Sequence, residues 1–155
     1  MYSTDARWYK HWIETLTRDY EGNLWTQSIA WPKETPPEAW GITVLKGCTQ
    51  GIGLSTDPEV LHCGQNSGFA AVNLAYHRLN GEGGKIILLG FDMHVHNGKR
   101  HFFGAHPGNM EVDSNYNDFM RNFRKIDCAA LGIDIWNCTR RTALDCFPLI
   151  DLDTL

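Results

Sequence analysis

The run KIILLGF at residues 85–91 constrains the fold more than any other stretch of the chain. Its residues 86–89 are all large and apolar, and no polar residue alternates with them. Such a run is typical of a strand that is buried on both faces, as strands are in parallel sheets with helices on each side. We therefore expect residues 85–91 to form an inner strand of a layered α/β fold.

Helical patterns flank this strand on both sides. Apolar residues recur at helical spacing in residues 67–79 and again in residues 114–130. Glycines at 80–84 end the first helix, and the run GIDIWNC at 132–138 predicts another strand. This alternation indicates a mostly parallel sheet. One or two further helical turns are expected in residues 139–148, before they stop at Pro148.

The first half of the chain shows shorter elements. Asp5 is a suitable N-cap for a helix over residues 7–16, in which apolar residues follow every fourth position. The remaining segments predict strands at 23–28, 42–46 and 59–63, and loops at 31–41 and 47–58.

Composition excludes several classes of protein. The chain of 155 residues has the length of one domain, 1–155, and with 43% hydrophobic and 21% charged residues it is globular. A net charge of −4 argues against a general nucleic-acid binder. No apolar run is long enough for a membrane span, and the N-terminus has no apolar signal core. Five cysteines, none in a CxxC pair, favour reduced thiols, so we expect a cytoplasmic protein that does not bind membranes.

Ligands of parallel α/β folds bind at the carboxyl ends of the strands. That edge would hold the segment GQNSG at 64–68, the loop after Phe91 and the turn after Asn137. In the first of these, glycines allow close backbone approach, and a helix start offers free N–H groups to an anion. Its candidate residues are Gly64, Asn66, Ser67 and Gly68. The pattern leaves open whether this segment cradles an anion or only caps a helix.

The loop after Phe91 carries the groups that acid–base chemistry would use. Asp92 ends the central strand, where it could act as an acid, a base or a ribose ligand, or could cap a turn. Histidines follow at 94, 96, 101 and 106, with spacing that matches no closed zinc module, so we expect no metal. His106 is the best candidate for a general base, because GAHPG places it between turn residues.

Two arginines and two cysteines beside the candidate loops each have a functional and a purely structural interpretation. Arg140 and Arg141 could clamp a phosphate or form an exposed basic pair. Cys63 and Cys138 flank the candidate loops, but no basic group beside them would activate a thiolate, so buried small residues are the better interpretation.

Several motifs taken together resemble a Rossmann-like family of phages and prophages. They are an N-S-G turn that opens a helix, a strand that ends in G-F-D, a His-bearing loop in HFFGAHP, and the ending GIDIWNCTRRTALDCFP. The segment DARWYKHW also resembles part of that family. The resemblance covers about residues 2–150 and extends to bacterial CMP-sialic-acid sialyltransferases and 6-hydroxymethylpterin pyrophosphokinase-like proteins. It implies a Rossmann-like three-layer sandwich with a mostly parallel sheet.

The resemblance also implies a nucleotide site. The turn at Asn66, Ser67 and Gly68 would hold the nucleotide together with the last loop. In that loop the matching residues are Asn137, Thr139 and Thr142, with Arg140 beside them. Asp92 matches the acidic strand end, and His106 lies in the region of the family's base. The related sialyltransferases need no metal, so no resident cofactor is expected.

The chain departs from the family pattern at its start. Longer members begin with a strand and a G-N-G-P-S loop around the donor phosphates, whereas this sequence starts MYSTDARWY. We therefore expect the fold to lack that first strand. Two functions follow: a glycosyltransferase-like protein that uses a nucleotide-activated donor, or a non-catalytic binding protein that captures a nucleotide. The open sheet edge and the many aromatic residues also predict a possible homo-oligomer.

Overall fold

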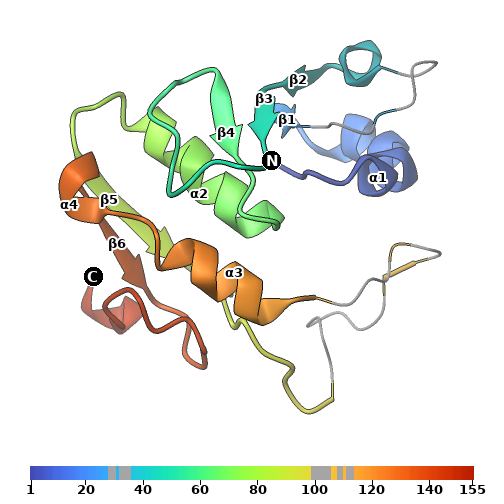
Figure 1. The fold of residues 1–155 in the computed structure, drawn as a ribbon. Helices are drawn as coiled ribbons and strands as arrows, with labels where there is room; N and C mark the ends of the chain where they lie inside the picture. Colours follow the sequence, from blue (N-terminus) through green and yellow to red (C-terminus); the bar gives the residue numbers. More distant parts are fainter. Residues whose placement is uncertain (28–30, 32–35, 99–105, 108–109, 111–113) are drawn as a thin grey trace.

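A computed structural model describes residues 1–27, 31, 36–98, 106–107, 110 and 114–155 of the chain. Helices and short parallel strands are mixed along the sequence, which confirms an α/β protein (Figure 1). The helices are α1 Ala6–Asp19, α2 Ser67–Arg78, α3 Tyr116–Phe123 and α4 Cys128–Leu131, with 3₁₀ turns at Pro37–Trp40 and Leu152–Thr154. The strands are β1 Leu24–Thr26, β2 Ile42–Val44, β3 Lys46–Cys48, β4 Val60–His62, β5 Gly84–Leu88 and β6 Ile133–Asn137.

Within the described residues the strands pair two by two, and every pair is parallel. The pairs are β1 with β2, β3 with β4, and β5 with β6. Leu45 joins the first two pairs, because it lies between β2 and β3 and its N–H donates to Thr26 O at 2.8 Å. The strand expected at 42–46 is thus divided between two pairs.

The N-terminus reaches the edge of the first pair. Tyr2 forms a single parallel bridge with Trp25 of β1, and the Met1 amino group donates to Asn23 O at 2.7 Å. One bridge is not a strand, but residues 1–3 do lie where a strand beside β1 would run. Asp5 then caps α1 by accepting from Arg7 N at 2.8 Å, as the sequence predicted.

The buried side chains form two clusters. The larger one fills the space between α2, α3 and one face of the β5–β6 pair, and its members are Leu54, Phe69, Val72, Ile86, Leu88, Phe123, Ile126, Ile133, Ile135, Leu144 and Phe147. The smaller one, Tyr9, Leu16, Leu24 and Ile42, fixes α1 against β1 and β2. Phe123 is completely buried at the centre of the larger cluster, where its ring contacts Phe69, Phe91 and Phe147.

Three expectations about secondary structure were wrong. Strand β5 is buried on one face only, since Ile87 is 40% exposed and Leu89 is 57% exposed. The helix expected over 114–130 is divided into α3 and α4 by a turn, after which Asp127 caps α4 by accepting from Ala130 N at 3.0 Å. Residues 139–148 form bends and irregular backbone and no helix, because the side chain of Asn137 and the loop after β5 bind their backbone instead.

Among the described residues, no helix combines the length and the apolar character that a membrane span requires.

Candidate functional site

A hollow of about 260 Å³ lies between the start of α2 and the loop after β5. It brings together two of the three segments that the sequence predicted to meet. Its lining residues are Asn66, Gly68, Gly90, Phe91, Asp92, Met93, His94, Ser114, Tyr116 and Phe119. The hollow therefore combines a helix start, a carboxylate, an imidazole and aromatic rings.

The start of α2 is shaped by Asn66 and Gly64. Asn66 Oδ1 accepts from Phe69 N at 2.8 Å, so this residue is the N-cap of the helix. Gly64 has a φ of +52°, and a Cβ at this position would lie 2.1 Å from the ring of Phe69. Only glycine fits there, and local structure accounts for it without a ligand. Gly68, by contrast, lines the hollow, and a Cβ at this position would lie 3.1 Å from the ring of Phe91.

Ser67 bonds to the N-terminal segment. Its hydroxyl lies 2.7 Å from Thr4 Oγ1 and accepts from Thr4 N at 3.3 Å. Ser67 is not among the residues that line the hollow. Sequence reasoning did not identify Thr4, because the two residues are 63 positions apart and only the fold brings them together.

The loop that follows β6 hydrogen-bonds to the backbone of two residues that line the hollow, Phe91 and Asp92. Thr139 Oγ1 accepts from Phe91 N at 2.9 Å, and Thr142 Oγ1 donates to Phe91 O at 2.6 Å. Both backbone polar groups of Phe91, its N–H and its C=O, are therefore fixed by this loop. Ala143 N also donates to Asp92 O at 2.8 Å. These contacts determine where the side chains of Phe91 and Asp92 lie.

Asn137 fixes the last loop itself. Its side chain is fully buried, its Oδ1 accepts from Thr139 N at 3.0 Å, and its Nδ2 donates to Leu144 O at 3.2 Å. Asn137, Thr139 and Thr142 thus lie behind the hollow and do not line it. The neighbouring Arg140 is exposed. Direct ligand contact by these four residues stays a prediction.

His94 is the imidazole that lines the hollow. Its Nδ1 lies 3.1 Å from Val95 O, a distance at which the ring nitrogen can donate to this carbonyl. The predicted base, His106, is half-buried but does not line the hollow, and His101 lies outside the described residues. His94 belongs to the histidine group noted in the sequence, and its position directly after Asp92 and Met93 was the signal that could have selected it.

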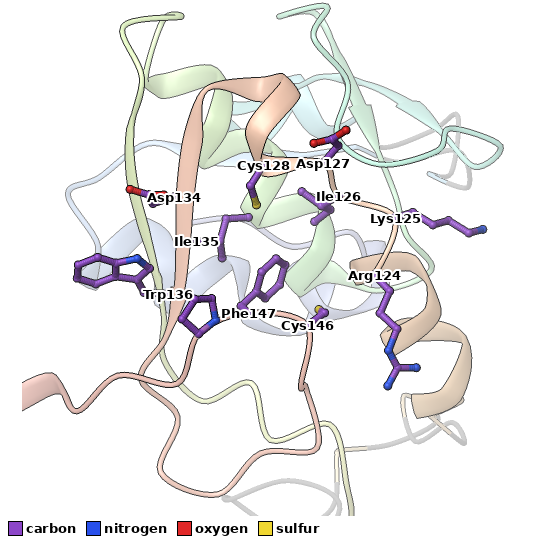
Figure 2. Close-up of a pocket in the computed structure, with 11 residues that line it drawn as sticks. Arg124, Lys125, Ile126, Asp127, Cys128, Asp134, Ile135, Trp136, Cys146 and Phe147 are labelled. Atoms are coloured by element: carbon purple, nitrogen blue, oxygen red, sulfur yellow. The ribbon is translucent and has the colours of Figure 1, made fainter.

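A larger hollow of about 560 Å³ lies beside β6 and holds none of the predicted site residues (Figure 2). Its lining comes from residues 124–128, 134–136 and 146–148. An ion pair of 2.8 Å joins Arg124 to Asp145 at its rim. The thiols of Cys128 and Cys146 line this hollow, and burial raises the pKa of both. Neutral thiols are poor nucleophiles, so neither cysteine is a candidate nucleophile in this hollow.

The half-buried thiol of Cys146 gives a testable expectation. Burial raises its pKa to about 11 from 9.0, so alkylation by iodoacetamide at pH 8 should be roughly 100-fold slower in the folded than in the unfolded chain. The raised pKa also means that this thiol stabilises the fold below pH 9 and that the contribution is lost as pH rises through 11. Labelling followed by peptide mass spectrometry measures the rate, and equal rates with and without denaturant would contradict the expectation.

Among the described residues, no three His, Cys, Asp or Glu side chains converge as metal ligands would. Comparison with known protein families, curated proteins and solved structures found no match to this chain.

Proposed function

We propose that the chain is a nucleotide-binding, glycosyltransferase-like protein that holds a nucleotide-activated sugar donor at the hollow between α2 and the loop after β5. The observation that carries the proposal is the meeting of Gly68 at a helix start with Asp92 and His94 in one hollow. The helix dipole attracts phosphate, the carboxylate accepts from ribose hydroxyls, and the imidazole takes a proton.

Aromatic side chains support the nucleotide part of the proposal. Tyr116 and Phe119 lie on one wall, with an edge-to-face contact between their rings, and Phe91 lies on another. Aromatic rings bind bases by stacking, largely without regard to base identity. The volume of about 260 Å³ is near the lower limit of ligand pockets, so it suits a nucleoside, and the sugar of a donor would extend beyond it.

We further propose that the parallel strand pairs belong to a Rossmann-like sandwich in which β4 and β5 direct these loops toward the ligand. The turn at residues 64–68 follows β4, and residues 89–94 follow β5. This placement agrees with the rule that ligands bind at the carboxyl ends of parallel strands. The second helical layer of such a sandwich, over the outer face of β5–β6, is not formed by the described residues of one chain.

One observation favours the non-catalytic alternative. The residues that line the hollow in the described part of the chain include no Lys or Arg. Phosphoryl leaving groups are usually stabilised by such cations. A protein that captures a nucleotide without cleaving it does not need them, so binding and transfer must be tested separately.

Nucleotide binding is tested by thermal shift with CMP, UDP, ADP and their sugar conjugates. A nucleotide at 100 times its dissociation constant should stabilise the chain by about 2.7 kcal/mol. Gly68→Leu should abolish the shift by filling the hollow, and Asp92→Asn should weaken it by removing a carboxylate. Asp153→Asn, at an exposed position far along the chain, is the matched control. No shift with any nucleotide would overturn the proposal.

If a nucleotide binds, donor hydrolysis separates the two functions. Loss of a general base lowers the rate by about 10²–10⁴-fold. We expect this loss for His94→Ala and little change for His96→Ala, because His94 is the one described histidine among the lining residues. If His106→Ala lowered the hydrolysis rate instead, the base would be His106, as the sequence predicted. Binding without measurable hydrolysis or transfer would establish the non-catalytic alternative.

A further inference from the structure

The β5–β6 pair has one face without a cover among the described residues. Lys85 is in register with Asp134, and Ile87 is in register with Trp136, so these four side chains project from the same face. Figure 2 shows Asp134 and Trp136 on the opposite side of β6 from Ile135, which points into the core. We call the set Lys85, Ile87, Asp134 and Trp136 the outer face.

The outer face is apolar at its centre. Ile87 is 40% exposed, Leu89 just beyond the strand is 57% exposed, and Trp136 is half-buried. A two-stranded sheet with one solvent-exposed face is only marginally stable, because each strand leaves half of its side chains outside the core. Apolar residues gathered on one sheet face are typical of a surface that binds another protein.

The charges on this face match a second copy of the same face. Lys85 and Asp134 are cross-strand neighbours, so the face carries one cation and one anion, and the Lys85 ammonium lies 3.3 Å above the Trp136 ring. A two-fold axis that lies between two stacked copies of this face and runs parallel to the strands would place Lys85 opposite Asp134 of the second copy and repeat the same contact in reverse. A strongly acidic or basic partner would meet no net charge here.

We propose that two copies of the chain associate through their outer faces, with the two β5–β6 sheets packed about 10 Å apart. Ile87 and Trp136 of each copy would fill the space between the sheets. The second copy would then cover the face of β5–β6 that the described residues of one chain leave exposed. The proposal does not depend on the nucleotide site, which lies at the ends of the strands.

The first test places a charge at the centre of the interface. Ile87→Asp should convert the dimer to a monomer and raise the dissociation constant by at least about 100-fold, because it leaves a carboxylate buried between two sheets. Ile52→Asp is the control, since Ile52 is 74% exposed in a loop away from this face. Sedimentation equilibrium gives the masses, and circular dichroism shows that each variant is folded.

The second test reverses the charges. Lys85→Asp and Asp134→Lys should each weaken the dimer, since each places like charges opposite one another. An equimolar mixture of the two variants should form a heterodimer in which both contacts are attractive again. Recovery in the mixture cannot arise from misfolding of either variant.

The proposal is overturned if the wild-type chain sediments as a monomer up to about 1 mM, which corresponds to a binding free energy weaker than roughly −4 kcal/mol. A dimer that survives Ile87→Asp, or one that the charge reversals do not affect, would also overturn it, because the copies would then meet elsewhere.

Discussion

Replacing Asn73 with alanine should destabilise the chain by about 2–6 kcal/mol, one of the two largest effects we expect. The side chain is completely buried in α2, and its Oδ1 accepts from both Ser55 N and His62 N at 2.9 Å. Its Nδ2 donates to Ser55 O at 3.1 Å. Alanine would leave two backbone N–H groups without partners, and each buried unpaired group costs about 1–3 kcal/mol.

The loss should be measured by urea unfolding followed by tryptophan fluorescence. Asn117→Ala is the matched control, because Asn117 is an exposed helix residue in α3 whose replacement should change the unfolding free energy by less than about 0.5 kcal/mol. Equal stabilities for the two variants would show that residues 53–62 do not depend on Asn73 for their position.

Asn73 illustrates what the sequence could predict. The spacing of apolar residues correctly predicted α2, and the segment at residues 64–68, which the sequence offered as a cap or an anion cradle, does cap the helix through Asn66. Both features depend on neighbours within one or two turns. The role of Asn73 depends on Ser55 and on His62 of β4, which only the tertiary fold brings near. A polar residue in an otherwise apolar helix face was the available signal, but it does not identify the partners.

The outer face of β5 shows a different limit. An apolar run such as 85–91 predicts burial, and in one chain only alternate residues of β5 are buried. The sequence shows that Ile87 and Leu89 are apolar, but it does not show whether another molecule covers them. If two copies associate as proposed, the prediction of a strand buried on both faces describes the dimer.

The candidate site was predictable where it depends on topology. Asn66, Gly68 and Asp92 line one hollow, and the segments that hold them follow β4 and β5, each of which is parallel to its own partner strand. The selection of His106 depended on the path of a loop, which local pattern does not determine. The resemblance predicted that Asn137, Thr139 and Thr142 lie beside the nucleotide. In the structure the hydrogen bonds of these residues stabilise the loop after β5, whether or not a ligand is bound.

Asn137→Ala tests that task and should destabilise the chain by about 2–4 kcal/mol. Its removal leaves Thr139 N without its acceptor and Leu144 O without the Nδ2 donor in the buried interior. If Asn137 only contacted a ligand, the variant would unfold at the urea concentration of the wild-type chain and lose nucleotide binding alone. We expect the stability to fall in the absence of any nucleotide.

Two substitutions of Thr139 distinguish a role in supporting the loop after β5 from direct contact with a ligand. Thr139→Val keeps the shape of the side chain but removes the oxygen that accepts from Phe91 N, so the chain should lose about 1–3 kcal/mol of stability. Thr139→Ser keeps that oxygen and should lie close to the wild type. Because Phe91 and Asp92 line the hollow, a nucleotide shift that decreases with Val and persists with Ser would show that the last loop acts on the ligand through them. Unchanged stability in the valine variant, together with lost binding, would instead make Thr139 a direct ligand residue.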